Sequence, residues 1–292
     1  DDLFHPQDNG IIAQSEENAS RTFGFKTLYS TQGSTLCIQA MLYLIRRNDI
    51  RNKRETKILA GRNSHKAFIN AAALIGIDVE WIFPQGGTYH SCDITPSRLE
   101  YEIIRFRPTA VYLTYPDYLG NMPDVGALSE VCKKHGVLLA VDGAHGAYLK
   151  FLPKSLHPID LGADICCSSA HKTLPVITGG AYLHISAGAP QLFFECAKKA
   201  LSLFASSSPS YLILQSLDAM NDKTAEFSQA LTAALPKISA LKARLVQHGF
   251  ELMGDEPLKI TVAPKSFGYT GEEIASILKK DNIYTEFYDS DF

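Results

Sequence analysis

The sequence predicts an α/β protein with three layers, in which helices cover both faces of a mostly parallel sheet. The first observation is that short apolar, β-rich runs alternate with stretches of helical periodicity from about residue 26 to residue 186. The second is their spacing, since parallel strands need crossover connections, and helices of roughly 10 to 15 residues fit between these runs. The third is composition, because 292 residues with 46% hydrophobic content can bury a large core.

Seven apolar runs are the candidate strands of this sheet. In chain order they are KTLYS (26–30), KILAG (57–61), VEWIF (79–83), TAVYLTY (109–115), GVLLAVD (136–142), ADICCSS (163–169) and GAYLHI (180–185). Between the early runs, Ser34–Arg47 and Ser64–Ile75 place apolar side chains at helical spacing. We expect these two stretches to be helices packed on the sheet.

The pattern changes after about residue 188. Pro190–Phe204 and Tyr211–His248 are predicted to be helical, and the second stretch ends at Gly249. A strand LKITVAP (258–264), a helix Thr270–Lys280 and a strand IYTEFY (283–288) are then expected. The predicted division is a large ligand-binding core over 1–188, a helical segment completing it over 189–249, and the beginning of a truncated α+β domain over 250–292. We expect the natural protein to continue beyond both ends.

Charge and cysteine content narrow the class of partner. Lys plus Arg number 28 against 31 Asp plus Glu, so the net charge of -3 gives no basic surface for nucleic acid or an acidic membrane. No apolar run approaches ~20 residues and no signal peptide is visible, which predicts a cytoplasmic protein with a small-molecule partner. The six cysteines lack metal-ligand spacing, so no metal site is expected, and Cys166 and Cys167 are predicted to pack as small hydrophobes.

Ligands of parallel sheets bind at the carboxyl ends of strands, so the residues that follow each run carry the functional prediction. The stretch STQGST (30–35) places Gly33 where a backbone can approach closely, with Ser34 and Thr35 at a helix N-terminus that favours an anion. The alternative is a simple N-cap with a turn glycine, and this stretch alone favours it.

Two basic side chains also follow strands. His65 in GRNSHKAF (61–68) lies next to Ser64, the expected cap of the following helix, and could stack on a flat ring or be only structural. Lys172 in SSAHKTLPVITGG (168–180) comes just after ADICCSS. A partly desolvated lysine has a lowered pKa and attacks carbonyls, whereas most lysines are only solvated surface charges.

The stretch VDGAHG (141–146) supplies a carboxylate. Asp142 ends an apolar strand, where an unpaired carboxylate is costly and needs a cationic partner. Gly143 and Ala144 leave room for a flat group, and His145 either lies on that group or bonds locally. A phosphate cup, a ring stacker, a carboxylate for a pyridinium nitrogen and a Schiff-base lysine are together the parts that pyridoxal 5'-phosphate requires.

Nine stretches carry a family resemblance as well. They are DDLFHP, AQSEENASRTFG, STQGST, RNSHKAF, VDGAHGAYLKF, SSAHKTLP, SSSPSYLILQSLDAM, EPLKIT and GYTGEEIASIL. Together they resemble the Orn/Lys/Arg decarboxylase family of fold-type I pyridoxal-phosphate enzymes, in the family's order and through nearly all 292 residues.

The resemblance implies a role for each matching residue. Lys172 would form the internal aldimine, Asp142 would pair with the pyridinium nitrogen, and His65 would stack on the ring. The implied phosphate contacts are Ser34 with Gly33 and Thr35, and Ser169 and His171, which also orient the lysine. Ala144 would pack beneath the ring with His145 close by.

The resemblance also implies a homodimer or higher homo-oligomer. The segment SSSPSY (206–211) matches the one that crosses to the other subunit, so Ser207 would reach the phosphate held by that subunit. A departure follows the lysine, where TLPVITGG with Gly179 replaces the small polar residues and frequent glutamine of well-known members. Because of this departure, the resemblance supports the family less strongly as a guide to which substrate this chain uses.

The implied activity is decarboxylation of a basic L-amino acid (lysine, ornithine or arginine) to the amine and CO2 through an aldimine with Lys172. Glu286 and Asp289 are candidates for recognising the distal amine, or are solvated surface residues. One alternative is another fold-type I activity, namely an aminotransferase, lyase or aldolase. The other is a family member that binds cofactor weakly or not at all and serves as an assembly or regulatory subunit.

Overall fold

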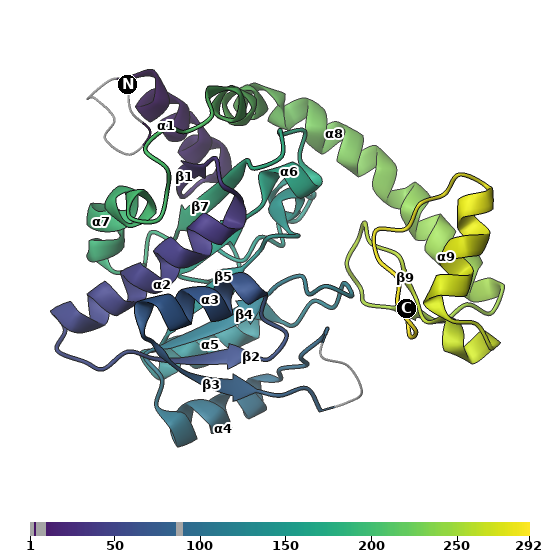
Figure 1. Cartoon of the computed structure of the whole chain (residues 1–292), viewed down its shortest axis with the longest axis horizontal. Helices are drawn as coiled ribbons and strands as arrows, with labels where there is room; N and C mark the ends of the chain where they lie inside the picture. The colour runs from purple at the N-terminus through teal and green to yellow at the C-terminus, as the bar shows by residue number, and fades with distance from the viewer. Residues whose placement is uncertain (1–2, 4–9, 86–89) are drawn as a thin grey trace.

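A computed structural model describes residue 3 and residues 10–85 and 90–292 (Figure 1). The DDLFHP stretch, apart from Leu3, lies outside the described residues. Within the described ranges no helix is both long and apolar enough to cross a membrane.

All seven predicted runs form strands of one sheet. The strands are β1 (Lys26–Ser30), β2 (Lys57–Gly61), β3 (Asp78–Ile82), β4 (Ala110–Thr114), β5 (Leu138–Asp142), β6 (Ile165–Ser168) and β7 (Ala181–Ile185). Their order is β1-β7-β6-β5-β4-β2-β3, and only β7 runs against its neighbours. The prediction of a mostly parallel sheet is therefore confirmed.

Helices form the outer layers of this fold (Figure 1). They are α1 (Ile11–Phe23), α2 (Gly33–Arg51), α3 (Lys66–Ile75), α4 (Pro96–Phe106), α5 (Val125–Lys134), the short α6 (Ala170–Thr173) and α7 (Gln191–Ser202), with a 3-10 turn η1 (Ala147–Phe151). In the described structure α2 packs against α3 and α7, whereas α4 packs against α5. The connections through α3 and α4 run in opposite directions across the sheet, and right-handed crossovers then place these two helices on opposite faces.

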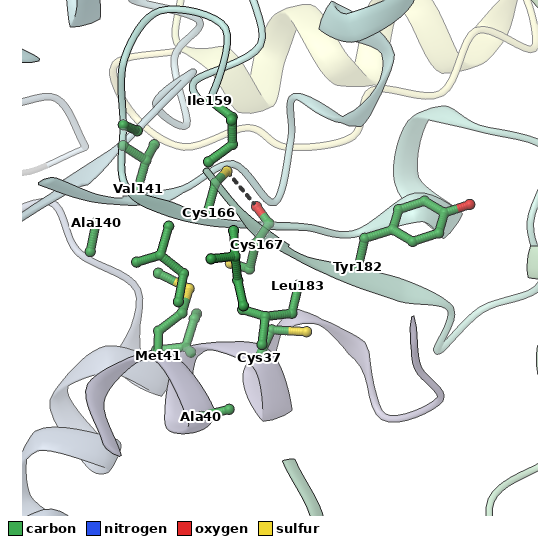
Figure 2. Close-up of a cluster of buried hydrophobic side chains, with 14 of the residues drawn as sticks. Cys37, Ala40, Met41, Ala140, Val141, Ile159, Cys166, Cys167, Tyr182 and Leu183 are labelled. Atoms are coloured by element: carbon green, nitrogen blue, oxygen red, sulfur yellow. Dashed lines mark hydrogen bonds between the residues drawn. The ribbon is translucent and has the colours of Figure 1, made fainter. Parts of the chain in front are cut away.

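The strands beneath the ligand edge are buried on both faces. Cys166 and Cys167 of β6 are fully buried, as predicted, and the Cys166 thiol donates to the Cys167 carbonyl at 3.3 Å. Figure 2 shows them beside Val141 of β5, with Cys37 and Met41 of α2 close by. This apolar packing fixes the ends of β5 and β6, from which the candidate site is built.

One local prediction about helix capping is wrong. His65, rather than Ser64, is the N-cap of α3, and its Nδ1 accepts from the Ala67 N–H at 3.2 Å. The Ser64 hydroxyl turns back and donates to the Gly61 carbonyl at 2.7 Å. The cap is one residue later than predicted because an imidazole with an unprotonated nitrogen can also accept the second amide of a helix.

The C-terminal part begins with α8 (Tyr211–Gln247), a helix of 37 residues that extends away from the sheet (Figure 1). After it come β8 (Leu252–Met253), β9 (Thr261–Val262), the 3-10 turn η2 (Pro264–Phe267) and α9 (Gly271–Lys280). The strand predicted over 258–264 is therefore only two residues long. Its antiparallel partner β8 is equally short, which limits the ladder.

The strand predicted at IYTEFY (283–288) is wrong, since these residues form no strand. Instead, the ring of Phe287 lies edge-on to Tyr118, with centroids 5.1 Å apart, and 5.5 Å from His90. Alternating apolar residues predict a strand only where a partner supplies the ladder. Here aromatic packing replaces that ladder and brings the segment to the ligand edge.

Candidate cofactor site

The site centres on Lys172, which lies in α6 just after β6. Its Nζ is 3.0 Å from Nε2 of His145, a residue in the turn that follows β5. Burial, with the charges of Lys172, Lys259 and His65, lowers the pKa of His145 to about 3. His145 is therefore neutral near pH 7, and its Nε2 fits an acceptor for the lysine amine.

Lys172 itself is shifted toward its reactive form. Partial burial lowers its pKa from the ordinary value, and the charge on Lys259 acts in the same direction. The carboxylates of Asp142 and Glu286 oppose this shift. A lowered pKa increases the fraction of neutral amine, which is the nucleophilic form of a lysine.

Asp142 is the last residue of β5 and is only 2% exposed. Its Oδ1 accepts from the Ala144 N–H at 3.0 Å and from the Cys167 thiol at 3.5 Å. Burial and the charge of Asp142 raise the pKa of Cys167 well above its ordinary value, so the thiol remains a donor. Among the described residues no lysine, arginine or histidine forms an ion pair with Asp142, and a buried carboxylate of this kind suits a cationic ligand atom.

The turn after Asp142 depends on a glycine. A Cβ added at Gly143 would lie 2.9 Å from the Cys167 carbonyl oxygen and 3.0 Å from the Cys166 sulfur. Only glycine allows the chain to pass this close to β6. The close passage keeps Ala144 and His145 at the carboxyl edge, beside Lys172.

The start of α2, where an anion-binding position is predicted, lies against the segment that carries Ser169. The Ser169 hydroxyl donates to the Ser34 hydroxyl at 2.9 Å, which joins the two segments predicted to hold phosphate. Gly33 is the first residue of α2, with φ +70°, and no heavy atom lies within 4 Å of the position a Cβ would take. Thr35 is exposed in the same first turn. This open space at a helix N-terminus suits a phosphate.

The Gly179-Gly180 turn, which follows Lys172, contacts the start of α2 and His171. The Gly33 N–H donates to the Gly179 carbonyl at 2.7 Å, and Nδ1 of His171 lies 3.0 Å from the Gly180 carbonyl oxygen. His171 thus contacts the Gly179-Gly180 turn through Nδ1. Its structural part is to hold α6, and Lys172 with it, against the start of α2.

Two predicted residues stay apart from this cluster in the described structure. His65 is exposed at the start of α3, and Ser207 is exposed between α7 and α8. No hydrogen bond of the described chain joins either residue to Lys172. His65 thus lies at the expected carboxyl edge of the sheet, after β2. Ser207, in the described structure, makes no hydrogen bond with Lys172 of its own subunit.

A cavity of about 510 Å³ opens beside Lys172. Its lining comes from the large domain and from the C-terminal part: Pro116, His145, Lys172, Thr173, Glu256, Leu258, Lys259, Ile260 and Glu286. Glu286 thus faces the site. Asp289 instead places Oδ2 3.6 Å from Nε2 of His90, and its Oδ1 accepts hydrogen bonds from the main-chain N–H groups of the last two residues.

Sequence reasoning assigned no role to Glu256, Lys259 or Tyr118. Glu256 and Lys259 line the cavity, and the ring of Tyr118 is edge-on to His145 with centroids 5.8 Å apart. In the sequence, Glu256 and Lys259 belong to the EPLKIT stretch, which resembles the family but was given no functional role. Only the tertiary fold shows that this stretch reaches the edge of a distant sheet.

The residues present fit pyridoxal 5'-phosphate. The fit rests on the open cradle at Gly33, the buried Asp142 without a cationic partner, and the Lys172 amine beside His145. The buried hydroxyl of Thr114, in register with Asp142, also has no hydrogen-bond partner in the described chain. A polar heterocycle with a phosphate tail would satisfy these groups.

Comparison with other sequences agrees with this geometry. The sequence model of the Orn/Lys/Arg decarboxylase major domain matches residues 1–245. The chain is 31% identical to the uncharacterized protein YaaO and 28% identical to an arginine decarboxylase, both of Bacillus subtilis. Each alignment covers 99% of this chain and 61% of the relative, so the chain spans about three fifths of their length.

Solved structures share the fold at low identity. Lysine decarboxylase A from Pseudomonas aeruginosa gives a TM-score of 0.80 at 16% identity, over 100% of this chain and 48% of that one. Oryza sativa TDC, solved with PLP, gives 0.72 at 14% identity, over 93% and 66%. The fold, together with a family match over most of the sequence, leads to one assignment: this chain belongs to the Orn/Lys/Arg decarboxylase family.

Proposed function

We propose that the chain binds pyridoxal 5'-phosphate at Lys172 and catalyses decarboxylation of a basic L-amino acid to the corresponding amine. The observation that carries the proposal is the Lys172 amine, with its lowered pKa, placed 3.0 Å from a neutral His145 on the edge that ends in Asp142. Membership of a decarboxylase family supports the reaction type, and arginine decarboxylases among the relatives support a basic substrate.

Each part of the cofactor has residues to hold it. Asp142 would accept from the protonated ring nitrogen, while His65 and Ala144 would lie against the ring. The phosphate would take Ser34, Ser169, and the Gly33 and Thr35 end of α2, with Ser207 of a second subunit completing the site in a homodimer. When bound, the cofactor supplies an electron sink for the bond that breaks at the substrate α-carbon.

The chain's own groups manage the protons. Lys172 would be the covalent attachment point, and its Nζ lies 3.0 Å from Nε2 of His145. Because the pKa of His145 is about 3, the imidazolium form that would donate a proton is hardly populated near pH 7. Lys172, once displaced by the substrate amine, is therefore the group we assign to deliver a proton to the α-carbon.

The cavity beside Lys172 suggests how a basic substrate is chosen. Glu286 lines it, and its charge acts on both Lys172 and Tyr118. A distal ammonium or guanidinium group would neutralise this carboxylate. We therefore assign Glu286, and not Asp289, to substrate recognition, and we propose that residues 250–292 form a separate unit that supplies this wall to the domain of residues 1–249.

The test is product analysis. The purified chain, supplied with pyridoxal 5'-phosphate, is incubated separately with L-lysine, L-ornithine and L-arginine, and the products are identified by mass spectrometry. Carbon dioxide with cadaverine, putrescine or agmatine is expected, and Lys172→Ala should abolish it. A keto acid would instead identify an aminotransferase. Failure of the chain to bind the cofactor would favour an assembly or regulatory subunit.

A further inference from the structure

The segment 254–261 docks on the turn that follows β4. The main-chain N–H groups of Asp255 and Glu256 both donate to the Gly120 carbonyl, at 3.0 and 2.9 Å. A Cβ added at Gly254, whose φ is +73°, would lie 2.5 Å from the backbone of Gly120. The two chains thus touch backbone to backbone, which fixes the position of the segment.

Glu256 secures the segment from inside. It is 5% exposed, and its carboxylate accepts from the Tyr148 hydroxyl and from the Lys259 main-chain N–H. Lys242 of α8 donates to its main-chain oxygen at 2.5 Å. The backbone of Lys259 is therefore held by a buried group, although the Lys259 side chain faces the cavity.

The Lys259 side chain begins a series of contacts that ends at Lys172. Its Nζ donates to the Tyr118 carbonyl at 3.0 Å and lies 5.2 Å from the centroid of the Tyr118 ring. That ring is edge-on to His145 at an interplanar angle of 89°, and His145 bonds Lys172. A cation over a tyrosine ring and a hydrogen bond to the same residue both restrain it.

We propose that Lys259 is a positioning residue of the cofactor site, which holds Tyr118 against His145 and so orients His145 on the Lys172 amine. The inference rests on the proposed binding of the cofactor at Lys172. In this proposal the EPLK stretch of the C-terminal unit places the Lys259 ammonium group against Tyr118, at the edge of the large domain.

The charges around Lys172 are consistent with this role. The carboxylates of Asp142 from β5 and Glu286 from the C-terminal segment both favour the charged form of the amine. Lys259 acts against them and lowers the pKa of both Lys172 and His145. Removal of the Lys259 charge should therefore raise the pKa of Lys172, a change that loss of packing alone does not predict.

The experiment compares Lys259→Met with Lys242→Met. Both replacements remove a lysine that contacts the same segment, but only Lys259 touches Tyr118. Cofactor-free protein is titrated with pyridoxal 5'-phosphate across a range of pH, and the visible absorbance of the bound cofactor gives both the affinity and the pH midpoint of binding. Circular dichroism confirms that each variant is folded.

For Lys259→Met we expect roughly three- to tenfold weaker binding, as the loss of one hydrogen bond of ordinary net strength predicts, and a pH midpoint shifted upward. Lys259→Arg should restore most of the affinity, and Lys242→Met should behave as the wild type. If Lys259→Met is unfolded, Tyr118→Leu removes the ring that contacts Lys259 and His145 but keeps the main-chain carbonyl to which Lys259 donates, and it should also weaken binding.

Two outcomes count against the inference in different ways. A folded Lys259→Met with wild-type affinity and an unmoved midpoint would overturn it, as would a folded Tyr118→Leu with wild-type affinity. A wild-type chain that borohydride cannot trap at Lys172 would instead overturn the proposed function, and the role of Lys259 with it.

Discussion

The two walls of the cavity differ in construction. The large-domain wall carries His145 and Lys172 on the segments that directly follow β5 and β6. In these segments Asp142, the last residue of β5, and Ser169, the N-cap of α6, are 2% and 1% exposed. The C-terminal wall places Lys259 and Glu286 on irregular chain next to a ladder of two short strands. The difference indicates that the groups proposed to hold the cofactor are set in a buried core, while those proposed to face the substrate are set on a part with little regular structure.

The difference between the two walls predicts that the largest loss of activity follows a substitution on the large-domain wall. Lys172→Ala removes the attachment point and the proposed proton donor together, so amine production should fall roughly a thousandfold or more. Production is measured as amine formed per unit time at saturating cofactor. The exposed Lys154→Ala serves as the control and should retain wild-type activity.

A change at Asp142 should separate activity from stability. Asp142→Asn keeps the shape and an acceptor for the Ala144 N–H but removes the charge that would hold the ring nitrogen protonated, so activity should fall roughly a hundredfold. The thermal midpoint of the cofactor-free chain should be equal to or above that of the wild type, because a buried charge without an ionic partner is removed. A clear drop in that midpoint would show that Asp142 supports the fold instead.

The interior of the large domain should respond to acid, in contrast to the exposed C-terminal part. His157 and His184 are buried with ring centroids 4.8 Å apart, and burial lowers the pKa of His157 from 6.5 to about 3 and that of His184 well below its ordinary value. Below pH 6.5 the unfolded chain binds protons that the folded chain does not. The free energy of unfolding should therefore fall with pH, by at most about 1.4 kcal/mol per pH unit for each histidine.

Urea unfolding at pH 7 and pH 5 measures this dependence. His157→Phe retains an aromatic ring beside Phe25 and should flatten the decline. His248→Gln, at an exposed position after α8, should leave it unchanged. A wild-type chain equally stable at both pH values would contradict the assignment of neutral buried rings.

The smallest effect is expected at the C-terminal wall. Glu286→Gln should raise the KM for the preferred basic amino acid by about two- to fivefold, because an ion pair in partly exposed surroundings contributes little. The turnover number should change less than KM. Asp289→Asn, which alters a carboxylate paired with His90 outside the cavity lining, is the matched control and should leave KM unchanged.

Sequence patterns predicted the large-domain wall well and the C-terminal wall poorly. Asp142 and Lys172 could be placed because each follows an apolar run, and parallel strands bring such ends to one edge. Lys259 could not, because its position depends on Gly254 meeting Gly120 and on the buried Glu256. No local periodicity encodes contacts of that kind.

The two errors in local structure have the same origin. The strand expected at 283–288 lacked a partner, and its Phe287 ring packs on Tyr118 instead. The cap expected at Ser64 moved to His65, because two neighbouring side chains competed for the same helix start. In both cases several local structures suited the sequence, and tertiary contacts selected one.

The measurement that tests the central claim most directly is the mapping of the lysine that holds the cofactor. The wild-type chain is mixed with equimolar pyridoxal 5'-phosphate, reduced with borohydride, digested and analysed by mass spectrometry. We predict one dominant adduct, on the peptide that contains Lys172. Adducts spread over exposed lysines such as Lys154, or a dominant adduct at Lys259, would contradict the site described above.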